Sequence, residues 1–289
     1  MKKPLFTGVC TAMVTPFLDG QINYPMMEQL LRRQIDAGVQ AVVIAGTTGE
    51  SATLSDEEKI TLFRRCKSYV GDQCLIIAGT GSNNTAHAVE LSVTAQEEGA
   101  DALLVVSPYY NKATPDGIVA HYLSICQYTS IPIIIYNVPG RTGLDIPISV
   151  YKQLCMISGI AGVKEASTDI TKIAKIRNVC GSDFPIWSGN DDQIVPVMSM
   201  GGHGVISVLS NLYPKETQKI CNAALNGDYR LAAELQCKHL PLIDALFSEV
   251  NPIPIKAAMR EIGYDCGNCR LPLCEMSIDK LTILKSMLK

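Results

Sequence analysis

Short apolar runs alternate along the chain with longer segments in which apolar residues recur at helical spacing. Eight of the runs are rich in Val, Ile and Ala, as strands are, and they span residues 8–15, 41–45, 75–78, 102–106, 133–136, 160–163, 186–188 and 204–207. Because these runs are almost continuously apolar, we expect both faces of each strand to be buried, as in a parallel sheet covered by helices. Strand and helix units that repeat eight times predict an α/β fold, a closed (β/α)8 barrel.

Helix start signals precede three of the longer segments. They are Ser55 with the acidic residues 56–58 before residues 59–69, Asn84 and Thr85 before residues 86–98, and Pro115 with Asp116 before residues 117–126. Such helices, placed between successive apolar runs, are the crossover connections that parallel strands need.

Helical patterns continue beyond the final helix that a barrel requires. We therefore expect a barrel over residues 1–225 and an appended C-terminal helical tail over residues 226–289. No linker rich in Ser, Gly or Pro divides the chain. A doubly wound sheet gives the same periodicity and stays open as the alternative, although the strand count favours closure.

The composition indicates a globular protein that acts on small molecules. Of 289 residues, 47% are hydrophobic and 18% are charged, which supplies a large core and excludes a disordered chain. A net charge of −3 without a long Lys/Arg run disfavours nucleic acid as a partner. No apolar run could span a bilayer, and polar residues soon follow the N-terminal lysines, so we expect no membrane segment, no secretion signal and a cytoplasmic location.

Eleven cysteines are present, most of them inside apolar periodic segments, where reduced and buried thiols are the simplest account. Cys266, Cys269 and Cys274 form a C-x2-C-x4-C cluster that is typical of a zinc site. A fourth Cys or His does not follow nearby, so we expect no metal.

In a barrel, chemistry is expected at the carboxyl ends of the strands, so the residues just after each apolar run are the candidates. Polar side chains collect there, namely Thr47, Thr48, Ser107, Tyr109, Tyr110, Tyr136, Asn137, Lys164, Glu165, Ser188, Asn190 and Asp191. Glycine-bearing stretches also follow two of the strands, but they contain neither a dinucleotide fingerprint nor a P-loop lysine, which argues against a nucleotide cofactor.

Lys164 is the most informative candidate, because it ends an apolar run where an unpaired ammonium would be costly. Such a lysine is suited to attack a carbonyl and form a Schiff base. A salt bridge to Glu165 is the alternative, but adjacent strand residues point to opposite faces, so we expect Glu165 to face away from the lumen. Tyr136 either caps the core or relays protons, and Arg141 either is solvated or grips a carboxylate.

Seven ordered motifs resemble those of the dihydrodipicolinate synthase and N-acetylneuraminate lyase superfamily, and the likeness covers nearly the whole chain. They are AGTTGES (45–51), AGTGSN (78–83), SPYYNK (107–112), YNVPGRTG (136–143), GVKEAS (162–167), SGNDD (188–192) and GGHGVISV (201–208). The pair of threonines in the first motif and Arg141 resemble dihydrodipicolinate synthases, whereas sialic acid lyases usually carry a Ser-Thr pair and lack this arginine.

The resemblance implies a role for individual residues. Lys164 would form an imine with pyruvate, and Tyr136, Thr47 and Tyr110 would form a proton relay in which Tyr110 reaches the neighbouring subunit. The residues that would hold the substrates are Thr48 and the backbone near Ile206 for pyruvate, Arg141 for the carboxylate of aspartate semialdehyde, and Gly189 and Asn190 for the second pocket. Many members have Asp where Asn190 stands.

The implied reaction is a condensation of pyruvate with L-aspartate 4-semialdehyde to 4-hydroxy-tetrahydrodipicolinate, toward diaminopimelate and lysine, in a homo-oligomer that is expected to be a tetramer. It needs no metal or nucleotide, since the imine itself is the electron sink. Two alternatives stay open, a pyruvate-dependent aldolase that cleaves sialic acid or a keto-sugar acid, and a non-catalytic barrel that binds a keto acid.

The resemblance also locates a site at which L-lysine inhibits some relatives. The positions retained here are Ser51, Ala52, Asn83 and Tyr109, and the positions changed here are Asp56, Lys59 and His87, which replace two histidines and a glutamate. The carboxylate that would pair with the ammonium of the effector is lost at position 87. We therefore expect a degenerate site and weak inhibition by lysine.

Overall fold

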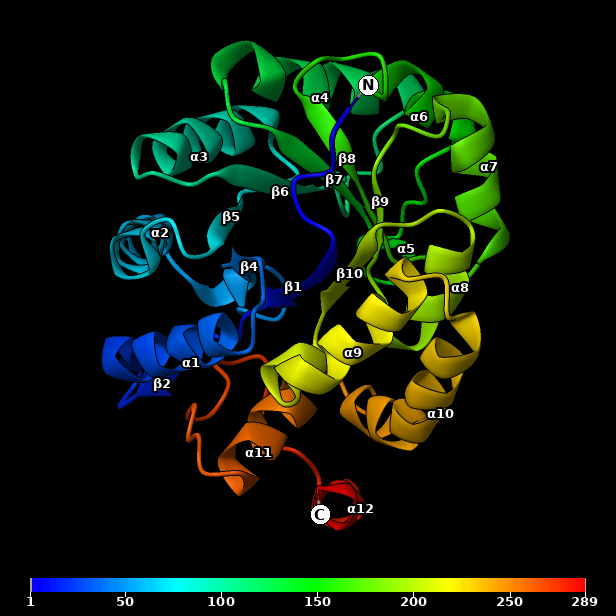
Figure 1. Cartoon of the computed structure of the whole chain (residues 1–289). Helices are drawn as coiled ribbons and strands as arrows, with labels where there is room; N and C mark the ends of the chain where they lie inside the picture. The colour runs from blue at the N-terminus through cyan, green and yellow to red at the C-terminus, as the bar shows by residue number, and fades with distance from the viewer. Residues whose placement is uncertain (1, 289) are drawn as a thin grey trace.

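The computed structural model describes residues 2–288 and has eight parallel strands that close into a barrel with helices around it (Figure 1). Around the barrel the order is β1-β10-β9-β8-β7-β6-β5-β4. The strands are β1 (Gly8–Ala12), β4 (Ala41–Ile44), β5 (Leu75–Gly79), β6 (Ala102–Val106), β7 (Ile133–Asn137), β8 (Ile160–Glu165), β9 (Ile186–Ser188) and β10 (Gly204–Ser207). The predicted (β/α)8 barrel is confirmed and the doubly wound alternative is wrong.

The helices lie outside the strands; those from α1 to α8 connect one strand to the next, and α9 to α12 follow the last strand. They are α1 (Tyr24–Asp36), α2 (Asp56–Val70), α3 (Thr85–Glu97), α4 (Pro115–Tyr128), α5 (Pro139–Thr142), α6 (Ile148–Leu154), α7 (Thr171–Cys180), α8 (Ile194–Ser199), α9 (Pro214–Leu225), α10 (Tyr229–Leu246), α11 (Ile253–Glu261) and α12 (Ile278–Met287). Ser55 and Glu58 form a reciprocal capping box at the start of α2, and Asn84 caps α3, as their start signals predict. Thr114 caps α4, and Pro115 is its first helical residue.

The predicted strand 8–15 is too long, because β1 ends at Ala12. Beyond that residue the backbone N–H of Val14 donates to the side chain of Asn211 at 3.1 Å instead of to a neighbouring strand. A two-stranded hairpin of β2 (Phe17–Leu18) and β3 (Gln21–Ile22) follows. The apolar run therefore continues past the strand, because its last residues stay buried after the ladder ends at the hydrogen bond from the Met13 N–H to the Val43 carbonyl of β4.

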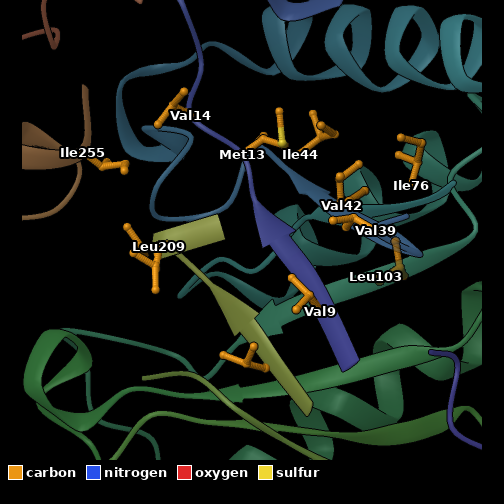
Figure 2. Packing of buried hydrophobic residues seen from close by; sticks show 14 of the residues in the cluster. Val9, Met13, Val14, Val39, Val42, Ile44, Ile76, Leu103, Leu209 and Ile255 are labelled. Atoms are coloured by element: carbon orange, nitrogen blue, oxygen red, sulfur yellow. The ribbon is translucent and has the colours of Figure 1, made fainter. Parts of the chain in front are cut away.

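Two apolar clusters form the core. The larger one lies between the strands and the helices, and Figure 2 shows part of it, with Val9, Val42 and Ile76 on neighbouring strands. The smaller one fills the lumen and includes Ile134, Trp187 and Ile206. Since every barrel strand is buried on both faces, the unbroken apolar runs in the sequence have a direct physical cause.

The C-terminal helices pack against the barrel on one side. Figure 1 shows α10, α11 and α12 on the side of α1 and α9, away from α3 and α4. Ile255 of α11 joins the larger apolar cluster near Val14 (Figure 2). Helix α9 ends at Leu225. The division of the chain into a barrel over residues 1–225 and a tail over residues 226–289 stays a prediction. Within residues 2–288, no helix has the length and apolarity that a membrane crossing demands.

Candidate active site

Lys164 and Tyr136 face each other at the carboxyl ends of β8 and β7. The two residues are paired in register on neighbouring strands, and the Lys164 Nζ lies 4.4 Å from the centroid of the Tyr136 ring. Both side chains are buried. Tyr136 belongs to the apolar cluster of the lumen, so the lysine amine projects into that lumen beside its ring.

The Lys164 amine has no polar partner of its own. Within residues 2–288, neither a carboxylate nor a hydrogen-bond acceptor lies in bonding contact with its Nζ, whereas the side chain is only 5% exposed. The amine is therefore not held by a salt bridge or a hydrogen bond, so it is free to meet a ligand in the lumen.

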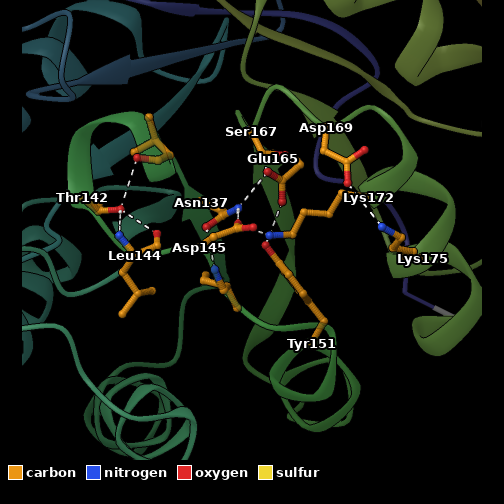
Figure 3. Close-up of polar contacts among 12 residues, drawn as sticks. Asn137, Thr142, Leu144, Asp145, Tyr151, Glu165, Ser167, Asp169, Lys172 and Lys175 are labelled. Carbon is orange, nitrogen blue, oxygen red and sulfur yellow. Dashed lines mark hydrogen bonds and ion pairs between the residues drawn. The ribbon is translucent and has the colours of Figure 1, made fainter.

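Glu165 points to the opposite side of β8, as strand alternation predicts. Its carboxylate accepts hydrogen bonds from the Asn137 Nδ2 at 2.8 Å, the Tyr151 hydroxyl at 2.9 Å and the Ser167 N–H at 2.8 Å (Figure 3). Burial, followed by the charge of Glu165, raises the pKa of Tyr151 well above its usual value, so this phenol stays a donor. The predicted orientation is confirmed, and Glu165 does not pair with Lys164.

An ion pair extends this network on the outer side of β7 and β8. Asp145 accepts from Asn137 at 2.8 Å and pairs with the buried Lys172 of α7 (Figure 3). Asn137 thus donates to two carboxylates from the residue directly after Tyr136. These bonds fix the carboxyl ends of both strands that carry the lumen pair.

The loop after β4 carries the two threonines of the first motif. Thr48 is buried and its Oγ1 accepts a hydrogen bond from the Asn251 Nδ2 at 3.0 Å, while Thr47 is half-buried. The Thr15 hydroxyl donates a hydrogen bond to the Gly49 carbonyl at 2.7 Å, which attaches the loop to the segment that follows β1. The loop is therefore tied both to the barrel and to the segment before α11.

Glu50 ends this loop and forms a fully buried ion pair with Lys256 of α11. The Lys256 Nζ lies 2.7 Å from the Glu50 Oε1, and the Arg270 N–H donates to the other carboxylate oxygen at 2.8 Å. Glu50 also has a left-handed φ of 58°. A non-glycine residue in that conformation is strained, and the ion pair stabilises it there.

A cavity of about 810 Å³ opens at this end of the barrel. Of the predicted catalytic and substrate-binding residues, Thr47, Tyr136 and Arg141 line it. Asn251 lines it as well and accepts a hydrogen bond from the Arg141 guanidinium through its backbone carbonyl at 3.3 Å. The cavity has the size and the mixed lining of a small-molecule site.

The other predicted substrate residues do not line this cavity. They are Thr48, Gly189, Asn190 and Ile206. Asn190 donates to the Ser167 carbonyl at 3.1 Å and to Gln193 at 3.2 Å, so its amide holds its own loop. A Cβ on Gly189 would approach the Ala166 Cβ to 2.5 Å, so close packing against the loop after β8 requires glycine here.

Asp191 positions the end of β10, where Ile206 lies. Its buried carboxylate accepts from the Ser207 hydroxyl at 2.5 Å and from the backbone N–H groups of Val208 and Leu209, both at 2.9 Å. Burial raises the pKa of this carboxyl, although these hydrogen bonds oppose the shift. Asp191 thereby fixes the backbone that follows Ile206.

Tyr110 points away from the cavity of its own chain. It is 88% exposed, has a φ of 68°, and does not line the cavity, whereas the neighbouring Tyr109 does. Thr47 and Tyr136 therefore line one cavity, and the third residue of the predicted relay lies at the surface of the chain.

The residues of the predicted effector site line the same cavity, and three of them contact one another. Asp56 lies 3.4 Å from the Lys59 Nζ and 2.7 Å from the His87 Nε2. Partial burial acts to raise the pKa of Asp56, but the hydrogen bond from His87 and the charge of Lys59 outweigh it and lower the pKa. The remaining members, Ser51, Ala52, Asn83 and Tyr109, also line the cavity.

The C-terminal cysteines do not gather into a metal site. Within residues 2–288, no three His, Cys, Asp or Glu side chains lie close enough to hold a metal ion. Cys266 is buried and Cys274 is exposed. Burial raises the pKa of Cys266 and of Cys269 to about 12, so both are protonated thiols near neutral pH.

Sequence reasoning named Asp191 only among the polar residues that follow the strands, and it missed Glu50, Asn251 and Lys256 as parts of the site. Glu50 stands inside the first of the seven motifs, which is the signal that could have found it. Asn251 lies in the turn before α11 and Lys256 lies in α11, and no local pattern distinguishes them there.

A (β/α)8-barrel enzyme, with its site at the carboxyl ends of the strands, is the class that this fold and cavity define. The chain is 45% identical over 289 residues to the 4-hydroxy-tetrahydrodipicolinate synthase of Acetivibrio thermocellus, with 100% of this chain and 98% of that protein covered. It is 48% identical over 286 residues to the protein of the same name from a Thermoanaerobacter species, with 99% and 96% covered.

A solved structure agrees with these relatives. The dihydrodipicolinate synthase from Cyanidioschyzon merolae with lysine bound superimposes with a TM-score of 0.96 at 39% identity, covering 99% of this chain and 98% of that one. A model of the dihydrodipicolinate synthetase family matches residues 5–289. The chain belongs to the dihydrodipicolinate synthetase family.

Proposed function

We propose that this enzyme condenses pyruvate with L-aspartate 4-semialdehyde to 4-hydroxy-tetrahydrodipicolinate, in the biosynthesis of diaminopimelate and lysine. The observation that carries the proposal is the buried Lys164 amine, which has no polar partner within residues 2–288 and lies against the ring of Tyr136. Family membership and the name of the relatives support the same reaction.

The chemistry begins at Lys164. Its amine adds to the C2 carbonyl of pyruvate, water leaves, and an imine forms that draws electrons from the neighbouring methyl carbon. Loss of a proton from that methyl group gives an enamine, which attacks the aldehyde carbon of the second substrate. The amine of that substrate then displaces the Lys164 nitrogen as the ring closes, which frees the lysine for another turnover.

A chain of hydroxyl groups moves the protons in these steps. Tyr136 is the member nearest Lys164, and Tyr136 and Thr47 both line the cavity. Tyr110 completes the relay from a neighbouring subunit, which accounts for a tyrosine that is 88% exposed in a single chain. The enzyme is therefore an oligomer, expected to be a tetramer and at least a dimer.

Substrate carboxylates are held by residues at the rim. Thr48 and the backbone at Ile206 bind the carboxylate of pyruvate, and Arg141 binds that of the semialdehyde through charge-assisted hydrogen bonds. Gly189 and Asn190 border the second pocket. No metal or other cofactor takes part, since the imine on Lys164 supplies the electron sink.

A cytoplasmic location fits the cysteine chemistry. All eleven cysteines are free thiols, as is usual in a reducing compartment. The enzyme thus works where its thiols stay reduced.

Reductive trapping tests the proposal. Borohydride added with pyruvate should fix one reduced pyruvate adduct per chain, and peptide mapping should place it on Lys164. A non-catalytic barrel would gain no adduct. Activity with N-acetylneuraminate that exceeds activity with the semialdehyde, compared as kcat/KM, would assign the protein to the sialic acid aldolases instead.

A further inference from the structure

We infer that Asn251 is a positioning residue of the pyruvate site, which holds the Thr48 hydroxyl ready to donate to the carboxylate of pyruvate. This inference rests on the proposed function, because it takes pyruvate as the ligand of Thr48. Asn251 lies between α10 and α11, in the C-terminal region, and it is 5% exposed where it lines the cavity.

The geometry connects both substrate-holding residues to this one asparagine. Its side-chain Nδ2 donates to the Thr48 Oγ1 at 3.0 Å, and its backbone carbonyl accepts from the Arg141 guanidinium at 3.3 Å. The two bonds use different parts of Asn251, so a change of side chain removes the first bond and keeps the second. The pyruvate side of the site can therefore be altered separately from the semialdehyde side.

The direction of the bond to Thr48 is what matters for binding. A threonine hydroxyl has one proton to donate and two lone pairs to accept with. Because the amide N–H of Asn251 fills one lone pair of the Thr48 oxygen, the hydroxyl proton stays available for another partner. A carboxylate only accepts hydrogen bonds, so this is the orientation that a pyruvate carboxylate requires.

The carbonyl oxygen of the Asn251 side-chain amide also supports a functional role. The Asn251 Oδ1 is buried and has no hydrogen-bond partner within residues 2–288. An unsatisfied buried acceptor costs stability, and a residue that served only the fold would be expected to satisfy both ends of its amide. The site instead keeps the amide turned with its donor toward Thr48.

The segment around Asn251 is held firmly enough for this role. Lys256, five positions along, pairs with Glu50 in a fully buried ion pair, and Glu50 ends the loop that carries Thr48. The hydrogen bond at Asn251 and the ion pair thus join the same two segments at two points.

Asn251→Asp is the decisive variant, because it keeps the shape of the side chain and replaces the donor with a negative acceptor. The Thr48 hydroxyl would then donate to Asp and turn away from pyruvate. We expect the pyruvate concentration that gives half-maximal borohydride trapping to rise by roughly ten- to a hundred-fold. The KM for the semialdehyde should change by less than about three-fold, since the backbone bond to Arg141 remains, a split that general loss of structure would not produce.

Controls separate this role from folding and from the proposed function. Asn222→Asp adds the same charge at an exposed position of α9 and should leave both constants unchanged. If Asn251→Asp fails to fold, Asn251→Ser, which shortens the side chain, should raise the pyruvate requirement in the same direction. In a Thr48→Val background, Asn251→Ser should have little further effect on trapping.

Two results would overturn the inference. Folded Asn251 variants that trap pyruvate at wild-type concentrations, with the adduct on Lys164, would remove the role of Asn251 and leave the proposed function intact. Wild-type protein that forms no adduct would overturn the proposed function and the role of Asn251 with it.

Discussion

Lys164 and Lys256 are buried to nearly the same extent, at 5% and 3% exposure, and each Nζ lies 4.4 Å from the centroid of an aromatic ring. The ring is Tyr136 for the first and Phe17 for the second. They differ in their polar partners. Lys256 lies 2.7 Å from a carboxylate oxygen of Glu50, whereas Lys164 has no carboxylate in contact within residues 2–288.

The comparison teaches that the polar partner, and not the degree of burial, distinguishes Lys256 from Lys164, the lysine that we propose to be reactive. Two further buried lysines agree with this, because Lys59 pairs with Asp56 and Lys172 pairs with Asp145. A carboxylate keeps a buried amine charged and unreactive, and an aromatic ring alone offers a much weaker counter-interaction. The first two predictions below test this difference, and the other two test the substrate and effector residues around it.

The largest effect is expected for Lys164→Arg. The guanidinium keeps the positive charge but is effectively always protonated, so it cannot attack pyruvate. We expect no trapped adduct and no turnover above background, with thermal unfolding close to that of the wild type. Appreciable turnover by this variant would assign the imine to another residue.

Lys256→Met should act on stability instead. It leaves the Glu50 carboxylate buried without its partner, which should lower the free energy of unfolding by about 3–5 kcal/mol in chemical denaturation. The double variant with Glu50→Gln should recover part of the loss, because no uncompensated charge then remains. Arg230→Ala breaks an exposed pair and should cost at most about 1 kcal/mol. Equal decreases in the free energy of unfolding for Lys256→Met and Arg230→Ala would show that the buried ion pair stabilises the fold no more than the exposed one.

Arg141→Ala removes the cation that we assign to the semialdehyde. The loss of a charge-assisted contact worth about 1.5–3 kcal/mol should lower kcat/KM for this substrate by roughly ten- to a hundred-fold. Pyruvate trapping on Lys164 should survive, because Arg141 bonds the backbone carbonyl of Asn251 and not the side-chain amide that holds Thr48. An equal collapse of pyruvate binding would make Arg141 a structural support for the whole site.

The smallest response is expected from added L-lysine. Asp56 is already paired with Lys59 and hydrogen-bonded to His87, so it offers little to the ammonium of an effector. An unpaired ammonium at such a site typically costs affinity by about two to three orders of magnitude. A lysine titration up to tens of millimolar, at saturating pyruvate, should show weak or no inhibition. Half-inhibition well below about one millimolar would contradict the prediction.

A reverse experiment sharpens this test. A triple variant combines Asp56→His, Lys59→His and His87→Glu. It restores the residue types that the resemblance implies for a site inhibited by lysine. The triple variant should gain inhibition by lysine if the lost carboxylate explains the insensitivity. Unchanged kinetics without lysine would show that the cavity keeps its catalytic function.

The sequence by itself determined the barrel and the two faces of β8. Eight apolar runs predicted eight strands, because a strand that is buried on both faces consists of consecutive apolar residues. The alternation of Lys164 and Glu165 followed from strand geometry alone, and contacts of Glu165 confirm it. Local sequence patterns are sufficient to predict a structural feature when the residues that determine it lie within a few positions of one another.

Only the tertiary structure decided which partners meet across the fold. The Thr48 and Asn251 side chains are 203 positions apart, and the Glu50 and Lys256 side chains are 206 positions apart. No periodicity near α11 marks either residue as part of the site. Pairing at such separation depends on how helices pack onto the barrel, since a hydrogen bond or an ion pair requires two groups within a few ångström of each other, and packing alone sets that distance.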